Sequence, residues 1–184
     1  MPDLIETLAS YTPTLISRRL AVDPTPITAP ASERFPAAVL FADISGFTAL
    51  TERLAQRSPA GAEELTQLLN TYFDQLIELI TGYGGDIVKF AGDALIALWP
   101  ATRQTELPAE AQLALAVHRA ARCSLLTQQR LNGYEVAPGI QLSLKLALGA
   151  GEILTMHLGG KYGRWEFLVT GDPLIQVGRA GQRI

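Results

Sequence analysis

Residues 84–99, GGDIVKFAGDALIALW, decide the fold of this chain. Two apolar runs, 87–90 and 94–99, flank the short sequence Ala91-Gly92-Asp93. Strand-forming runs that are separated by a few residues with a glycine are typical of a tight β-hairpin. The pattern therefore predicts a pair of antiparallel strands with Asp93 at the tip of their turn.

The segments before this hairpin predict one buried strand and one helix. Residues 37–42, AAVLFA, form a continuous apolar run between Pro36 and Asp43, which is typical of a strand buried on both faces. Apolar residues then recur at every third or fourth position over residues 65–80, which predicts a helix with one buried face. The glycines that follow are expected to end it.

The segments after the hairpin predict a second helix and further strands. Residues 108–131 are rich in Ala and Leu and, after Pro108, contain no Gly or Pro, which favours a long helix. Strict alternation over residues 140–148 predicts a strand with Lys145 on its polar side. A strand over 165–170 and a helix from Asp172 complete the pattern. Hairpins interleaved with helices predict an α+β fold, an antiparallel sheet with helices on one side.

The chain has 184 residues, of which 48% are hydrophobic, enough for one domain with a substantial core. Residues 1–36 differ from the rest, because a short helical patch is followed by four prolines in a polar setting. We expect residues 1–36 to form an N-terminal arm and linker, and residues 37–184 to form the domain.

Charge and composition exclude several classes of protein. Fifteen basic and eighteen acidic residues give a formal net charge of −3, which does not favour binding to nucleic acid. No apolar stretch approaches the roughly 20 residues of a membrane-spanning helix, and the N-terminus lacks the features of a signal peptide. One cysteine, Cys123, and two histidines, His118 and His157, cannot form a zinc cluster and are interpreted as structural. We expect a cytoplasmic protein without membrane or nucleic-acid partners.

Two aspartates in similar positions point to chemistry. Asp43 follows the first buried strand, and Asp93 lies at the tip of the hairpin. If the two strands are neighbours, both carboxylates converge at one end of the sheet. Two close carboxylates repel each other unless a cation lies between them, and carboxylate oxygens suit Mg²⁺ or Mn²⁺. Such sites are typical of phosphoryl and nucleotidyl transfer.

Each aspartate also has a simpler explanation. Asp43 would serve equally as the N-cap of a helix that begins near Ser45. Asp93 beside Gly92 would serve as an ordinary turn residue. Gly46 favours the functional interpretation, because a glycine at a helix start lets backbone amides approach a phosphate.

Residues 41–48, FADISGFT, and residues 84–94, GGDIVKFAGDA, closely resemble the paired motifs of the class III nucleotidyl cyclases. They are most similar to the first catalytic half of the bicarbonate-responsive soluble adenylyl cyclases, and the resemblance covers residues 37–184. It implies a ferredoxin-like (palm-like) mixed, mostly antiparallel sheet with helices packed on it. It also implies conversion of ATP to cyclic AMP and pyrophosphate, and a domain that continues beyond Ile184.

The resemblance assigns roles to residues of both motifs. Asp43 and Asp93, with the carbonyl of Ile44, correspond to the ligands of two Mg²⁺ or Mn²⁺ ions. The amides of the next segment correspond to the cradle of the triphosphate, and Lys145 to a basic residue that touches the phosphates. That segment is Gly46, Phe47 and Thr48.

Departures from the family pattern concern the half of the site that a partner domain completes. Lys89 stands at the position of the base-reading lysine and Arg179 at that of the transition-state arginine. Ile175, however, replaces the family's Asn, and Leu168 replaces its base-reading Asp or Thr. The resemblance therefore implies the metal-donating half of a tandem or heterodimeric pair whose partner supplies the Asn, with a homodimer as the alternative.

The vestigial second site of the soluble cyclases binds bicarbonate. Lys89 and Val169 match positions that line it, whereas Gly178 replaces the arginine that grips the anion and Arg179 is adjacent. The resemblance therefore leaves bicarbonate open as an activator.

Two further functions compete with a cyclase. A non-catalytic nucleotide- or bicarbonate-binding regulatory or dimerisation module is favoured by the missing Asn and opposed by the retention of both aspartates. A diguanylate cyclase is less favoured: Gly84-Gly85-Asp86 is similar to that family's signature loop, but Ile87-Val88 stands where Glu-Phe should follow.

Overall fold

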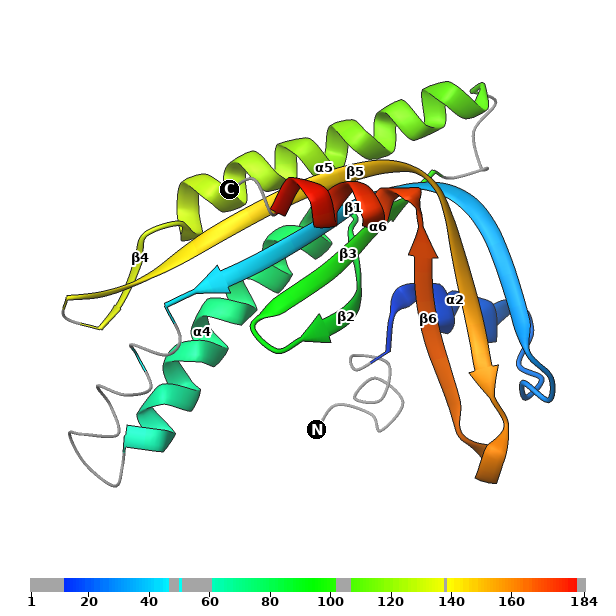
Figure 1. Cartoon of the computed structure of the whole chain (residues 1–184), viewed down its shortest axis with the longest axis horizontal. Coiled ribbons are helices and arrows are strands. Elements are labelled where there is room, and N and C mark those ends of the chain that lie inside the picture. Colours follow the sequence, from blue (N-terminus) through cyan, green and yellow to red (C-terminus); the bar gives the residue numbers. More distant parts are fainter. Residues whose placement is uncertain (1–11, 47–49, 51–60, 102–106, 138, 182–184) are drawn as a thin grey trace.

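The computed structural model describes residues 12–46, 50, 61–101, 107–137 and 139–181. Helices are interspersed with single strands and pairs of strands along the chain, and a short 3₁₀ turn lies between the last two strands (Figure 1). The elements are α2 (Thr14–Val22), β1 (Ala31–Ser45), α4 (Gly61–Gly82), β2 (Asp86–Ala91), β3 (Ala94–Pro100), α5 (Ala109–Leu131), β4 (Tyr134–Ala137), β5 (Ile140–Gly159), the 3₁₀ turn (Lys161–Gly163), β6 (Trp165–Gly171) and α6 (Asp172–Gly181).

The strands form one antiparallel sheet in the order β2-β3-β1-β5-β4, and β6 pairs with the second half of β5. The series β1-α4-β2-β3-α5-β5 is the βαββαβ order of a ferredoxin-like fold. The predicted α+β class and the central hairpin are thus confirmed. The turn of that hairpin consists of Gly92 and Asp93, and the positive φ of 67° at Gly92 suits glycine.

Alternate residues of β1 contribute to two separate apolar clusters. Leu40, Ala42 and Ile44 pack with α4 and α5, whereas Val39 and Phe41 pack with α2 and α6. We call these two sides of the sheet the α4/α5 face and the α2/α6 face. Because both sides are covered, the central part of β1 is apolar throughout, as its sequence predicted.

The hairpin is anchored to α4 through a close contact at its base. A Cβ atom on Gly85 would lie 2.5 Å from the Trp99 ring, so only glycine fits there. The Trp99 indole N–H donates a hydrogen bond of 3.0 Å to the Tyr83 carbonyl at the end of α4. This contact fixes where β2 begins.

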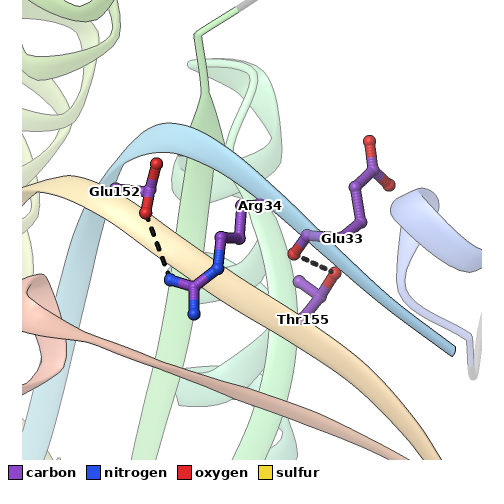
Figure 2. A network of polar contacts seen from close by, with 4 residues as sticks. All are labelled: Glu33, Arg34, Glu152 and Thr155. Carbon is purple, nitrogen blue, oxygen red and sulfur yellow. Dashed lines mark hydrogen bonds and ion pairs between the residues drawn. The ribbon is translucent and has the colours of Figure 1, made fainter.

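Beyond the compact part of the sheet, β1 and β5 bend together into an arch, and β6 runs back along β5 (Figure 1). Side chains also link the two long strands there, as Figure 2 shows. The Thr155 hydroxyl donates to the Glu33 carbonyl at 3.4 Å, and Arg34 pairs with Glu152 at 3.2 Å. Arg34 and Glu152 are more than 60% exposed, so their ion pair contributes little stability, and the backbone ladder holds the arch.

Several boundaries differ from the sequence predictions. Residues 31–36, assigned to a linker, belong to β1 because they pair with residues 152–157 of β5. The strand predicted over 140–148 continues to Gly159, so His157 lies within it and not after it. The short strand β4 was not predicted.

The helices also differ from the prediction that all lie on one side. Leu15 of α2 and Val177 of α6 pack on the face opposite to α4 and α5. The short helix α2 is bound to the sheet by a hydrogen bond between Thr14 and Asp86, which are 72 residues apart in the chain. Local sequence cannot reveal such a contact.

Candidate active site

Asp43 and Asp93 lie at the same end of two neighbouring strands. Asp43 of β1 pairs with Ala94 of β3, the residue directly after Asp93. The main-chain N–H of Ile44 donates a hydrogen bond of 3.3 Å to the Asp93 carbonyl oxygen. The predicted adjacency of the two strands is confirmed. Asp43 lies inside β1, which ends at Ser45. It therefore does not occupy the position directly before a helix that an N-cap requires.

Lys145 lies across from Asp43 on the next strand. The register between β1 and β5 pairs Asp43 with Lys145 and Phe41 with Ala147. Directly opposed residues of antiparallel strands project to the same side, with Cβ atoms roughly 5 Å apart. Within the described part of the chain, neither Asp43 nor Lys145 has a side-chain hydrogen bond or ion pair. This register places one acidic and one basic side chain on the same side of the sheet.

A cavity of about 170 Å³ lies between this charged pair and α6. Asp43 and Lys145 form part of its wall on the sheet side, and Val177, Gly178 and Gly181 form the α6 side. The sequence placed Gly178 where the family has an arginine. A Cβ atom at Gly178 would meet nothing within 4 Å, so the missing side chain leaves this side of the cavity open.

Gly46 begins the predicted phosphate-binding segment. Its φ of 109° favours glycine, and a Cβ atom there would lie 2.9 Å from the Gln141 carbonyl oxygen. Ile44, predicted as a carbonyl ligand, has a fully buried side chain. Phe47 and Thr48 lie outside the described residues, so their predicted role as triphosphate ligands stays a prediction.

The residues predicted to act with a partner domain lie on α6 and β6. Arg179 is exposed, and Ile175 is 53% exposed with no polar group to offer. Leu168 and Val169 are consecutive in β6 and half-buried, and Val169 packs into the apolar cluster of the α2/α6 face. Arg179 and Ile175 are thus accessible to a second molecule.

Lys89 belongs to a different cavity from Asp43. It pairs with Ile96 in the hairpin and lines a hollow of about 570 Å³ between β2, the end of α4 and the chain before α2. Thr12, Thr14 and Phe90 line the same hollow. The structure thus brings Asp43, Asp93 and Lys145 together and places Lys89 beside the N-terminal segment.

The donor set for a metal consists of oxygen atoms. Among the described residues, no group of three or more His, Cys, Asp or Glu side chains is arranged to hold a metal ion. The available ligands are the carboxylates of Asp43 and Asp93 and nearby main-chain carbonyls. Hard oxygen donors with open positions for a phosphate fit Mg²⁺ or Mn²⁺, which are often bound by one or two carboxylates together with substrate phosphates.

Sequence reasoning missed two polar residues on the α2/α6 face. Asp86 is 8% exposed, and its carboxylate oxygens accept hydrogen bonds of 2.7 and 2.8 Å from the N–H groups of Thr14 and Leu15. Gln176 binds the backbone of Ala150 through both atoms of its amide. An acidic residue next to two glycines was a weak signal for Asp86, whereas an exposed helical glutamine gives none.

The α2 helix also faces the arch. Burial and the charge of Arg19 lower the pKa of His157, whose ring lies 5.2 Å from that of Phe167.

No helix in the described ranges combines the length and apolar character that crossing a bilayer requires.

Known proteins resemble this chain in both sequence and structure. The family model for the adenylate and guanylate cyclase catalytic domain matches residues 30–172. Adenylate cyclase type 10 of Rattus norvegicus is 39% identical over 150 residues, which cover 80% of this chain and 9% of that protein. The Homo sapiens protein of the same name is 36% identical over 150 residues, with the same coverage. The chain thus spans less than a tenth of the length of these relatives.

Among solved structures, the guanylyl cyclase Cya2 superposes with a TM-score of 0.59 and 28% identity, covering 80% of this chain and 70% of that one. The matched region contains β1, the hairpin and β5, which carry Asp43, Asp93 and Lys145. This chain belongs to the family of adenylate and guanylate cyclase catalytic domains.

Proposed function

We propose that this chain converts ATP to cyclic AMP and pyrophosphate, using two Mg²⁺ or Mn²⁺ ions held by Asp43, Asp93 and the Ile44 carbonyl. The observation that carries the proposal is the placement of Asp43 and Asp93 at one end of adjacent strands, with Lys145 opposite Asp43. The relatives named adenylate cyclase favour ATP, and GTP is the competing substrate.

The chain's own residues divide the work between holding cations and contacting phosphates. The two carboxylates would hold the metal ions, whose positive charge would let a chain of net charge −3 bind a triphosphate. The Lys145 ammonium, which lies on the same side of the sheet as Asp43, would contact phosphate oxygens. Gly46 opens the backbone for close approach. When bound, the metal ions lower the pKa of the ribose 3′-hydroxyl and neutralise the departing pyrophosphate.

The proposed enzyme is one half of a paired site. Ile175 cannot donate the hydrogen bond that orients the ribose, and Leu168 reads no base edge. Loss of one oriented donor of this kind commonly lowers the rate by about 10²–10³. A complementary cyclase domain that supplies an Asn, in tandem or as a heterodimer, would complete the site; a homodimer would lack this contact.

Bicarbonate is a second proposed ligand, as an activator. Lys89 lines the hollow beside the N-terminal segment, whereas Gly178, next to Arg179, lines the cavity of Asp43, so a bicarbonate site that uses both cations would have to join two cavities. A regulatory module without catalysis would use the same anion site. The two functions differ in whether Asp43 and Asp93 are needed for turnover.

The decisive experiment mixes the chain with a complementary cyclase half and measures cyclic AMP formed from ATP, and cyclic GMP formed from GTP, in the presence of Mn²⁺. Asp43→Asn and Asp93→Asn should each lower turnover by at least about 100-fold. Asp74→Asn, an exposed carboxylate on α4, is the matched control.

Binding is measured separately on the chain alone, as the thermal shift caused by Mn²⁺ with a non-hydrolysable ATP analogue. A shift that Asp93→Asn abolishes supports the metal assignment. Full activity of either aspartate variant, or no shift in the parent chain, contradicts it.

A further inference from the structure

Helix α2 is docked on the sheet although none of its nine residues is buried. Leu15 packs against the apolar cluster of the α2/α6 face, whereas Leu20 is 44% exposed and Val22 is 88% exposed. An isolated helix of this length is only marginally stable in water. The helical form of α2 therefore depends on its contacts with the rest of the molecule.

The first turn of α2 is held by a residue from outside the helix. Pro13, directly before α2, makes no side-chain capping bond, and the first turn contains no acidic residue. The Asp86 carboxylate of β2 takes this role, because it accepts the N–H groups of Thr14 and Leu15. A carboxylate at a helix N-terminus satisfies N–H groups that have no partner within the helix. One end of α2 is thus fixed to the hairpin.

The last turn of α2 contains Arg19, which lies beside His157 of the arch. The Arg19 Nη1 atom and the His157 Nε2 atom are both shielded from solvent, and among the described residues neither atom has a hydrogen-bond partner. Burial and, to a smaller extent, the charge of Arg19 lower the pKa of His157. A neutral imidazole is tolerated in this place, whereas a protonated one would add a second shielded positive charge beside the guanidinium.

The neighbouring elements offer no charge that would hold a protonated His157 in place. His157 pairs with Ala31 of β1 and with Phe167 of β6. Within the described ranges, no carboxylate forms an ion pair with His157 or Arg19. The other charged residues near these positions in α2, β1 and β6 and after α2 are all exposed: Arg18, Glu33, Glu166 and Asp23.

The chain on either side of α2 allows this helix to leave the sheet. Residues 23–30, which connect α2 to β1, belong to no helix or strand and are almost all exposed. Before and at the start of α2, Thr12 and Thr14 form part of the wall of the hollow that contains Lys89. Departure of α2 would open this hollow to solvent and would leave the pairing of β1 with β5 unchanged.

We propose that α2 is a pH-sensitive strap, docked beside the hollow of Lys89 while His157 is neutral and released when His157 takes up a proton. Release gives both the imidazolium and the Arg19 guanidinium access to water. The contribution of neutral His157 to docking is complete above the ordinary histidine pKa of about 6.5 and is lost as the pH falls below it. The inference goes beyond the proposed function, because neither docking nor release requires turnover.

The first test is amide hydrogen exchange in the whole chain at about pH 7.5 and pH 5, expressed as protection factors to remove the intrinsic effect of pH. Protection over residues 14–23 should fall about threefold to thirtyfold at pH 5, and a released histidine of pKa about 6.5 sets the upper limit. His157→Gln should remove most of this fall. His118→Gln, which changes an exposed histidine on α5, is the matched control and should keep it.

Three exchange results would overturn the proposal. The first is equal protection of α2 at both pH values in the parent chain, and the second is an undiminished fall in His157→Gln. The third is equal protection of α2 and of the amides paired between β1 and β5, because α2 would then open only when the whole domain unfolds.

The contact with Leu15 is tested by a matched pair on the same helix. Leu15→Ala should lower the protection of α2 at pH 7.5 by about tenfold or more, because Leu15 packs against the sheet. Leu20→Ala, which changes an exposed leucine, should alter it less than about threefold. Equal effects of the two variants would show that α2 is not docked through Leu15 and would contradict the strap.

The second test is an NMR titration of His157, which reports on the contact with α2 directly. Arg19→Gln should raise the pKa of His157, because it removes the neighbouring positive charge. Arg18→Gln, which changes the exposed arginine next to it, is the control and should leave the titration of His157 unchanged. Identical titration of His157 in the parent chain and in Arg19→Gln would overturn the proposal, because α2 would then not lie against the histidine.

Discussion

The contact between Asp86 and the first turn of α2 supports a prediction that one substitution can test cleanly. Both carboxylate oxygens accept main-chain N–H groups, from Thr14 at 2.7 Å and from Leu15 at 2.8 Å. Hydrogen bonds to a charged group contribute about 1.5–3 kcal/mol each, and because Thr14 is exposed we take the lower end of that range. Asp86→Ala should therefore lower the free energy of unfolding by about 2–3 kcal/mol.

Thr14→Pro removes only one of these donors. Thr14 is the first residue of α2, where proline is tolerated, and Pro13 has φ −51° and ψ 139°, the extended conformation favoured before a proline. Relative to Thr14→Ala, the proline variant loses a hydrogen bond worth about 1.5 kcal/mol. It also gains about 0.4–1 kcal/mol because proline restricts the unfolded chain. Thr14→Pro should be less stable than Thr14→Ala by about 0.5–1 kcal/mol.

The sign of this difference should reverse when Asp86 is already alanine. The hydrogen bond is then absent from both chains, and only the stabilisation through the unfolded state remains. Urea unfolding followed by tryptophan fluorescence and far-UV circular dichroism measures the four free energies. If proline has the same effect in both backgrounds, with a coupling below about 0.5 kcal/mol, Asp86 does not hold α2.

Three further predictions follow from the packing and the titrating groups. Gly149→Ala should lower the free energy of unfolding by about 1–3 kcal/mol, because the added Cβ overlaps the Pro173 carbonyl oxygen. Gly178→Ala, whose Cβ meets no atom within 4 Å, should raise it by up to about 1 kcal/mol through helix propensity. Urea unfolding of both variants measures the two changes. Burial and Arg19 lower the pKa of His157 below its usual 6.5, so the unfolded chain binds this proton more readily than the folded chain. The contribution of His157 to the free energy of unfolding, present above about pH 6.5, is therefore lost as the pH falls. Between about pH 7 and pH 5 the free energy of unfolding should fall less in His157→Gln than in the parent chain. The side chain of Cys123 is fully buried, and burial raises the pKa of its thiol. Iodoacetamide should therefore label Cys123 in urea and leave it unlabelled in the native chain. Fast labelling of the native chain would show instead that α5 opens locally.

The central sheet could be predicted because its signals are local. The hairpin around Gly92 needs only a glycine between two apolar runs, and alternation in β5 placed Lys145 on its polar side. The convergence of Asp43 and Asp93 was expected if their two strands are neighbours, and the pairing of Asp43 with Ala94 confirms that adjacency.

The remaining features depend on contacts between distant parts of the chain. Asp86 binds the first turn of α2 and so fixes where this helix docks. Position 149 of β5 must be glycine because Pro173, which lies in a later helix, packs directly against it. Gln176 is an exposed glutamine in a helix, and nothing in the local sequence distinguishes it from a solvated one. The boundary at residue 36 was wrong for the same reason, since residues 31–36 are held in β1 by a strand more than 110 residues away.

The ladder between β1 and β5 limits how this molecule can move. Fifteen consecutive pairs, from Ala31 with His157 to Ser45 with Ser143, run without a shift in register. A continuous ladder of this length offers no internal joint, so the arch and the end of the sheet near Asp43 behave as one rigid frame. Any adjustment to an incoming ligand is therefore left to the two helices that pack on this frame, α2 and α6.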